Sequence, residues 1–593
     1  MLNQKISRAL SKRFNEFRLS LAYIDALPQL AILGLFVGVF TGLIIVAFRI
    51  LIDAPLTLIL LNDADNFESL SVQYRILFIM GGAILLGTIL HFLEKPKREM
   101  GIAHVLDRLH NFQGQLPATN WIWQFICGII CMLSGQSVGR EGPAVHMGAG
   151  AGSQLGQWLR LPNNSMNTIV ACGVAAGISA SFDTPMAGVI FAMEVIVLEY
   201  TIVGFVPVIL ASVVGTAISQ IVLGEPFHFD EVNNVELASL MELFYMIAVG
   251  IVIAVFSATY VKLHITSLKF NYIPVFFRLV IAGCIGVIAA IYVPQTMGLG
   301  YDTINQAVTG ELVLASLLII ALAKLFVTPT IIGLGVPGGL IGPCLIIGAC
   351  AGGALGVIFH MLFPELGISI EFYVMIGMAG MMAATLNAPL AALVAVLELS
   401  YNPNIIFPAM LVVVIACIFT RQIFRFNSIF IEQLNHTKRS LEFGRAEQVL
   451  KKVGVQSIMN KAFRNSSQIC DYEEAKRLLE IKPDWIVIEV LNKKYALRAA
   501  DLSNYLEDPP EEVLNNEQDI DLMEIPARRD MLVPVNERAN LLEAMAILKS
   551  KETKILYVSR GYPSLLGDVT GILTLHDIEN YYQPKEFSHV SVG

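Results

Sequence analysis

Predominantly apolar runs recur along the chain up to about residue 430, and charged residues become frequent beyond it. Residues 28–52 form the first apolar run and residues 75–93 the second. A helix of about 20 apolar residues is long enough to cross a bilayer. The pattern therefore predicts a membrane domain over residues 28–434 and a soluble domain over residues 435–593.

Charged residues beside the apolar runs predict the orientation of the chain. The loop 61–69 after the first run is acidic, whereas residues 94–99 are rich in lysine and arginine. Because basic loops stay in the cytoplasm, we expect a multi-pass protein of the cell membrane with both termini cytoplasmic. Residues 1–27 are predicted to form a cytoplasmic amphipathic helix on the membrane surface. The basic residues before the first run are Lys5, Arg8, Lys12, Arg13 and Arg18.

The second half of the membrane domain repeats the first. Residues 173–194 align without gaps to residues 377–398, and the dipeptide Gly-Pro occurs upstream in both halves. Duplicated segments interrupted by glycine and proline are typical of transporters, although small residues can also serve tight helix packing alone. We predict two repeats, at about 28–222 and 238–425.

Four prolines predict helices that begin inside the membrane. Proline suits the first helical turn, where no amide donor is needed. A helix that begins at membrane depth exposes unpaired N–H groups and the positive end of its dipole. Lipid cannot pair with these groups, so an anion is their natural partner. The four positions are Pro143, Pro185, Pro343 and Pro389.

Glu141 is the dominant acidic residue at such a start, in "GREGP" at 139–143. A charge at membrane depth is costly and marks a functional site by default. Its carboxylate can occupy the place of a mobile anion and leave when it is protonated; alternatively, it caps its own helix or pairs with Arg140. Asp183, just before Pro185, is expected to cap that helix. Glu194 and Glu398 are expected at helix ends or interfaces.

Composition supports a membrane protein and excludes several other classes. The chain is 55% hydrophobic and 15% charged, and its net charge of −9 gives no reason to expect nucleic acid. The eight cysteines show neither disulfide nor zinc spacing. His104 and His146 lack a ligand cluster, so we expect packed or hydrogen-bonded histidines and no metal site. No nucleophile stands with a base, so we do not expect an enzyme.

These motifs resemble those of the CLC family of chloride channels and chloride/proton exchangers. "GREGP" is its most specific signature, and "GGLIGP" at 338–343 is similar to its second anion-binding stretch. The resemblance implies an all-α polytopic membrane domain of two inverted repeats with broken helices. It also implies a homodimer in the lipid bilayer, with one pathway per subunit for chloride and possibly other anions and protons.

The resemblance also assigns site residues. Glu141 matches the gating glutamate. Met100 and Phe430 stand where the family has a serine and a tyrosine that donate hydroxyl groups to a central anion, so we expect a weakly occupied central site. The anion-binding candidates are Gly139, Arg140, Gly142, Leu340, Ile341, Met100, Gly101 and Phe430.

Proton coupling is the open question at this stage. Val195 falls where coupled exchangers commonly carry a second glutamate, which favours channel-like or weakly proton-coupled chloride transport gated by Glu141. Glu141 and Glu194 remain the proton-path candidates. The alternative is a proton-coupled chloride or fluoride antiporter, since the fluoride-exporting branch is also similar in having methionine at the position of Met100.

The soluble domain holds two similar stretches, 458–506 and 531–582, that resemble a pair of CBS motifs forming a small α/β domain. Such pairs often bind adenine nucleotides, and Thr574 and Asp577 match the residues that commonly contact ribose and phosphate. A module for dimerisation and stability is the alternative. We expect no other cofactor.

Two competing classes remain. A divalent-cation transporter with a CBS tail requires several carboxylates converging within the membrane, whereas this chain offers one dominant glutamate among helix starts. A pure sensor or scaffold has no need of Glu141 at such a depth.

Overall fold

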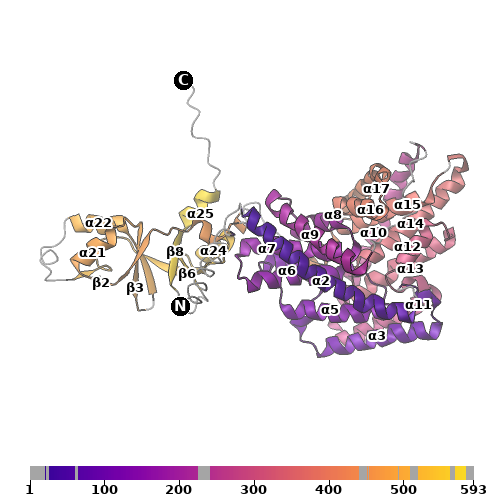
Figure 1. Ribbon diagram of the computed structural model, residues 1–593, viewed down its shortest axis with the longest axis horizontal. Coiled ribbons are helices and arrows are strands. Elements are labelled where there is room, and N and C mark those ends of the chain that lie inside the picture. The colour runs from indigo at the N-terminus through magenta and orange to yellow at the C-terminus, as the bar shows by residue number, and fades with distance from the viewer. Residues whose placement is uncertain are drawn as a thin grey trace, which may run out of the picture. The chain divides into compact units, whose positions relative to one another are not determined.

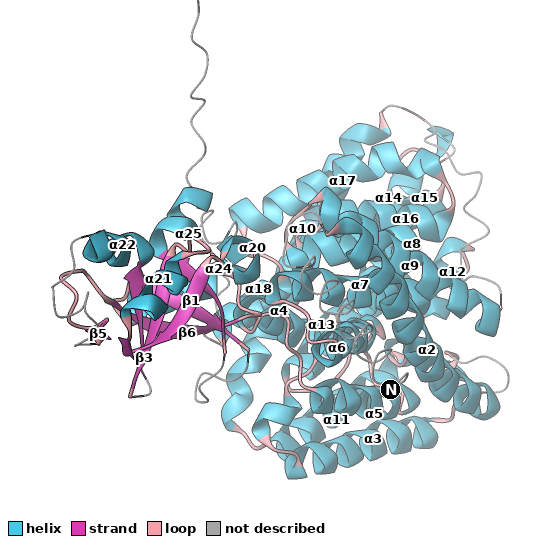
Figure 2. Ribbon diagram, turned by 60° about the vertical axis from the view of Figure 1, so that its left-hand side comes forward, coloured by secondary structure: helices cyan, strands magenta, loops and turns pink. Residues whose placement is uncertain are grey.

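The computed structural model describes residues 21, 26–60, 65–224, 239, 241–366, 368–437, 439, 450–451, 453–491, 493–507, 519–560 and 568–582. Two compact units are present: Leu30–Leu159 with Met166–Leu441, and Glu442–Gly593 grouped with the short segments Met1–Gln29 and Arg160–Ser165. The first unit is helical, and the described strands of the sheets all lie in the second (Figures 1 and 2). The amphipathic helix expected over residues 1–27 falls almost wholly outside the described residues.

The described residues of the first half of the helical unit form eight α-helices. Their lengths range from one or two turns to well over the thickness of a bilayer, as the interrupted apolar pattern predicts. They are α2 (Leu27–Ile59), α3 (Val72–Phe92), α4 (Gly101–Asn111), α5 (Ala118–Leu133), α6 (Glu141–Trp158), α7 (Asn163–Phe182), α8 (Pro185–Phe191) and α9 (Ile202–Leu223).

The second half repeats this order of helices and adds one more. A short helix again stands third, and helices that begin beside proline again stand fifth and seventh. They are α10 (Glu242–Leu268), α11 (Val275–Tyr292), α12 (Tyr301–Val308), α13 (Leu314–Gly333), α14 (Ile341–Leu362), α15 (Ile370–Leu386), α16 (Pro389–Ser400), α17 (Ile406–Ile418) and α18 (Ile429–His436). Among the described residues, nine helices are long and apolar enough to span a membrane.

All four prolines lie in the first turn of a helix, as predicted. Pro185 and Pro389 are the first residues of α8 and α16, and Pro143 and Pro343 are the third residues of α6 and α14. The missing N–H of proline costs nothing in the first turn, where no carbonyl partner exists. The sequence therefore located these four helix starts correctly.

Glycines let the helices after these starts approach closely, and they do so equivalently in both halves. The backbones of α6 and α7 touch at Gly148 and Gly173, and those of α14 and α15 touch at Gly348 and Gly377. Close backbone approach through small residues is a common way to pack helices in lipid, where burial of apolar surface gives little driving force.

The second unit has one principal sheet with strand order β1-β3-β4-β6-β7-β8 and a two-stranded sheet of β2 and β5. Each half of the principal sheet has a parallel pair followed by an antiparallel strand. The strands are β1 (Phe463–Ser467), β2 (Ile469–Cys470), β3 (Trp485–Val490), β4 (Lys493–Arg498), β5 (Ile520–Asp521), β6 (Asp530–Asn536), β7 (Ile555–Ser559) and β8 (Val569–Thr574). The helices are α20 (Val455–Ile458), α21 (Tyr472–Leu479), α22 (Ala499–Glu507), α24 (Leu541–Ser550) and α25 (Leu575–Tyr582).

Candidate functional site

The loops that precede α6 and α14 pair with each other. Gly139 N–H donates to the carbonyl of Gly339 at 2.8 Å, and Gly339 N–H donates back to the carbonyl of Gly139 at 2.7 Å. This two-residue antiparallel bridge sets the starts of α6 and α14 side by side. Neither start has a side-chain cap from its own preceding residue, Arg140 or Leu340. Two sets of first-turn N–H groups therefore meet at one buried place.

The carboxylate of Glu141 lies at this meeting point. The residue is 3% exposed, and its Oε1 faces the N–H of Gly342 in α14 and lies 3.5 Å from the hydroxyl of Tyr301. Its Oε2 has no hydrogen-bond partner in the described part of the chain. A Cβ atom added to Gly339 would lie 2.8 Å from this oxygen. The acidic side chain is thus turned toward both helix starts, where an anion would also be attracted.

Arg140 packs against two aromatic rings beside this site. Its guanidinium lies over the ring of Phe182 at 4.8 Å and over that of Tyr301 at 5.3 Å. It lines a cavity of about 260 Å³, which we call the Arg140 cavity. Arg49, Asp65, Tyr301 and Asp302 line it too.

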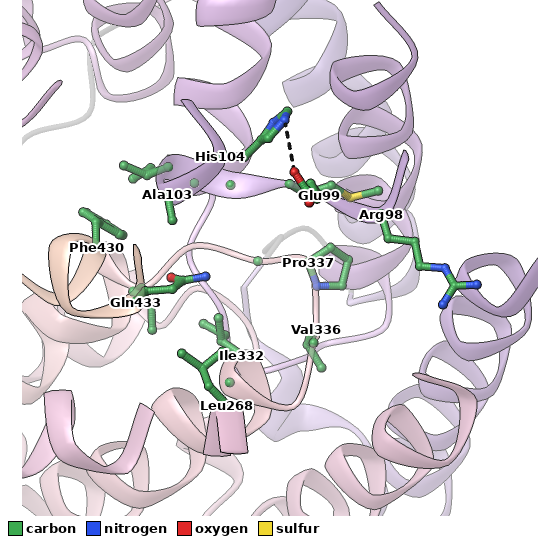
Figure 3. Close-up of a pocket in the computed structure, with 18 of the residues that line it drawn as sticks. Arg98, Glu99, Ala103, His104, Leu268, Ile332, Val336, Pro337, Phe430 and Gln433 are labelled. Atoms are coloured by element: carbon green, nitrogen blue, oxygen red, sulfur yellow. Dashed lines mark ion pairs between the residues drawn. The ribbon is translucent and has the colours of Figure 1, made fainter. Parts of the chain in front are cut away.

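A second cavity, of about 360 Å³, also reaches the starts of α6 and α14 (Figure 3). We call it the Phe430 cavity. It brings together five of the residues proposed for anion binding: Met100, Gly101, Gly142, Leu340 and Phe430. Ile341 and Glu141 line neither of the two cavities but share a small pocket of about 40 Å³. Arg140 and Gly142, the two neighbours of Glu141 in the chain, thus line different cavities.

Sequence reasoning missed Gln124, which organises the Phe430 cavity. Its Oε1 accepts the N–H of Gly101 at 2.9 Å, and its Nε2 donates to the carbonyl of Pro337 at 3.0 Å. The first N–H group of α4 thus has a side-chain acceptor, and the same side chain links α4 to the loop before α14. The only local signal was one polar residue in the apolar run "WIWQFICGIICML". Tyr260 was also missed, and its hydroxyl donates to the carbonyl of Leu340 at 2.9 Å.

His104 and His146 are hydrogen-bonded to each other, as predicted for packed histidines. The Nδ1 of His104 lies 2.9 Å from the Nε2 of His146, and Arg108 Nε donates to the Nε2 of His104 at 3.2 Å. Because that nitrogen accepts, His104 carries its proton on Nδ1 and donates to His146, which leaves both rings neutral. Glu99 lies 3.8 Å from His104 at the edge of the cavity (Figure 3).

The cap predicted for α8 comes from a different residue. Asp183 pairs with Arg49 at 3.4 Å and does not cap the helix. Instead Glu398 accepts the N–H groups of Met186 and Ala187 at 2.8 and 2.7 Å. A residue far along the chain took the role because α16 lies against α8, which local sequence could not reveal.

Glu194 provides the equivalent cap for α16 in the second repeat. Its carboxylate accepts the N–H groups of Leu390 and Ala391 at the start of α16, at 3.3 and 2.7 Å. The expectation that Glu194 and Glu398 lie at an interface is confirmed for the contact between α8 and α16. Val195 is a buried residue with 4% exposure.

In the second unit, Thr574 and Asp577 form hydrogen bonds with each other. Thr574 donates its N–H and its hydroxyl to the carboxylate of Asp577 at 2.9 and 2.6 Å, and Asp577 N–H donates to the hydroxyl of Thr574 at 3.1 Å. This reciprocal arrangement caps the start of α25.

The comparisons with known proteins agree with this geometry. A family model described as voltage gated chloride channel matches residues 81–421, more than half of the chain. The chain belongs to this CLC family. It is accordingly a multi-pass integral membrane protein of a transporter family and not an enzyme. The family match ends before the α/β unit.

Individual relatives of this CLC protein have low sequence identity to it. The H(+)/Cl(-) exchange transporter ClcA of Vibrio cholerae serotype O1 (strain M66-2) is 29% identical over 330 residues, which cover 54% of this chain and 69% of that one. The solved structure of a slow cyanobacterial Cl-/H+ antiporter matches with a TM-score of 0.62 at 20% identity, over 69% of this chain and 97% of that one. A eukaryotic CLC transporter matches with a TM-score of 0.56 at 17% identity, over 92% and 97%. These two structures support the fold.

Proposed function

We propose that this CLC protein exchanges chloride for protons across the membrane, with Glu141 as the gating and proton-accepting group. The observation that carries the proposal is the position of the Glu141 carboxylate at the starts of α6 and α14, whose neighbouring residues Arg140 and Gly142 line two different cavities. When it is charged, the carboxylate competes with an anion for the same N–H groups. Protonation removes that competition and frees the site.

This proposal replaces the channel-like interpretation favoured by the sequence. That interpretation rested on Val195, which cannot carry a proton, and Glu194 is engaged at the start of α16. The relative described above is nevertheless named as an H(+)/Cl(-) exchange transporter. We therefore favour the alternative, a coupled antiporter, in which another route supplies protons to Glu141. Membership of the CLC family favours anion transport over the divalent-cation transporter and the scaffold.

The test uses the full chain in liposomes that contain a chloride gradient and a pH-sensitive dye. If chloride and protons are coupled, the chloride gradient drives protons against their own gradient when the membrane voltage is clamped at zero. Chloride movement without any proton movement would overturn the proposal. A parallel set of liposomes loaded with fluoride separates the fluoride alternative, which predicts faster coupled flux of fluoride than of chloride.

Restoring the missing hydroxyl groups is expected to tighten anion binding. Met100 and Phe430 both line the Phe430 cavity, and neither can donate a hydrogen bond. A hydrogen bond to a charged partner contributes about 1.5–3 kcal/mol, so the double variant M100S/F430Y should bind chloride at least about tenfold more tightly. Titration calorimetry measures the change. The matched control, M100L/F430L, has no hydroxyl and should leave the affinity low; equal affinities for the two double variants would contradict the prediction.

We also propose that the two halves are inverted repeats. The antiparallel bridge between Gly139 and Gly339 supports this, as does the reciprocal capping of α8 by Glu398 and of α16 by Glu194. Equivalent residues exchange the same contacts when a two-fold axis passes between them.

The homodimer, the orientation and the role of the tail remain proposals. Glu194 and Glu398 are only partly buried at a largely apolar face, and a charge facing lipid is costly; a second copy covering this face removes that cost. We propose a location in the cell membrane with both termini cytoplasmic.

The repeated strand order of the principal sheet supports a CBS pair. Because Thr574 and Asp577 already cap α25, we favour a structural role for them over nucleotide binding.

A further inference from the structure

Tyr301 stands between the Arg140 cavity and the carboxylate of Glu141. Its hydroxyl donates to Oε1 of Glu141 at 3.5 Å, a long hydrogen bond. Its ring lies under the guanidinium of Arg140 and meets the ring of Phe182 edge-on at 6.3 Å. Tyr301 lines the Arg140 cavity, whereas Glu141 is not among the residues that line it. Tyr301 is therefore in contact with the carboxylate of Glu141 and also forms part of the wall of that cavity.

The turn that carries Tyr301 is held by a carboxylate from a distant loop. Asp65 accepts three consecutive backbone N–H groups, those of Leu299, Gly300 and Tyr301, at 2.8, 2.6 and 2.8 Å. Gly300, which precedes α12, has φ of 82° and offers no side-chain cap. Asp65 thus supplies the cap that α12 lacks and fixes the position of its first residue, Tyr301.

Further charged groups lie close to the same turn. Lys324 of α13 is fully buried, and a Cβ atom on Gly300 would lie 2.8 Å from its Nζ. Lys324 interacts electrostatically with Asp65, Asp302 and Glu68. Burial raises the pKa of Asp302 to about 7, and the carboxylates of Asp65 and Glu68 act in the same direction. The surroundings of this turn therefore contain one carboxyl group, that of Asp302, whose pKa lies near neutral pH.

We propose that Tyr301 is a second part of the gate, which holds Glu141 in its blocking position, and that Asp65 is the positioning residue for Tyr301. A hydroxyl that donates to a carboxylate stabilises its charged form. The phenol therefore favours the state in which Glu141 occupies the anion site, and it must release Glu141 before the gate opens toward the Arg140 cavity. This inference rests on the proposed gating role of Glu141.

The variant Y301F removes only the hydroxyl group and keeps the ring beside Arg140 and Phe182. Without the donor, the charged form of Glu141 is less stable. Glu141 then becomes protonated and leaves the anion site at a higher pH than in the wild type. We expect the curve of anion flux against the pH on the side of the Arg140 cavity to shift by about half to one unit toward alkaline pH. The measurement uses liposomes of uniform orientation at constant pH on the other side. A curve identical to that of the wild type overturns the proposal.

Asp65 is tested through its dependence on Tyr301. D65N should shift the curve in the same direction as Y301F, because the turn is held less firmly. The double variant D65N/Y301F should shift it no further than Y301F alone, since Asp65 acts through the hydroxyl of Tyr301. Additive shifts overturn the positioning role. Because Asp302 titrates in the same range, the same three curves are repeated in a D302N background. If D65N does not assemble, Y301F alone decides the proposal.

Two controls complete the experiment. E311Q neutralises an exposed carboxylate just beyond α12 and should leave the curve unchanged. E141Q, measured in parallel, tests the underlying function. If E141Q removes the pH dependence and Y301F has no effect, the inference on Tyr301 fails while the function of Glu141 stands. If E141Q retains the wild-type pH dependence, the proposed function itself fails.

Discussion

Replacing Glu141 by glutamine is expected to remove the pH dependence of anion transport and to uncouple chloride from protons. Glutamine keeps the size of the side chain beside Tyr301 and Gly342 but has no charge to compete with an anion and no proton to carry. Flux through E141Q should vary by less than about twofold between about pH 5 and pH 8, since one titrating group otherwise changes its charged fraction steeply over that range. Chloride and proton fluxes are measured together in liposomes.

The control for this variant is E311Q, which removes an exposed carboxylate of the same unit and should retain both coupling and pH dependence. A reversal potential of E141Q that still follows the pH gradient as in the wild type would show that protons travel without Glu141. That outcome assigns the carboxylate to a structural cap of α6.

Adding one methyl group at Gly339 is the second change with a large expected effect. In G339A the new Cβ atom would lie 2.7 Å from the carbonyl oxygen of Gly139 and from the N–H nitrogen of Gly142. Both contacts are with backbone, which cannot move aside without separating α6 from α14. Overpacking costs about 1–3 kcal/mol even where side chains can adjust. We expect transport to fall at least about tenfold, together with a lower melting temperature in detergent.

G81A is the matched control for this substitution. Gly81 lies in α3, and an added Cβ atom meets nothing within 4 Å, so the better helix propensity of alanine is gained without a clash. G81A should transport normally and melt at the same temperature as the wild type or higher. Normal transport and stability in G339A would contradict the inference that the two helix starts must touch.

Much of the candidate site was predictable because its chemistry is local. A proline in the first turn marks its own helix start, so Pro143 and Pro343 could be located from sequence. Glu141 stood out because a carboxylate between glycines at membrane depth needs a reason. Met100 and Phe430 were predicted to flank the anion path, and they do line one cavity.

The rest of the site depends on contacts between residues far apart in the chain. Asp183 stood where a cap is expected locally, yet Glu398 provides the cap of α8. Asp65 holds the turn before α12, although it comes from a loop far earlier in the chain. A carboxylate and an N–H group satisfy each other wherever the fold brings them together, and no spacing rule encodes a partner more than 200 residues away.

The sequence by itself determined the class of this protein. Apolar runs require a lipid environment, duplicated segments predict two similar halves, and proline in a first turn marks the start of a helix. The tertiary structure alone decided which groups meet: the pairing of Gly139 with Gly339, the neighbours of Glu141, and the contact of Tyr301 with that carboxylate. Helix starts are a property of a few adjacent residues, whereas the place where two starts converge is set by the packing of all the helices around them.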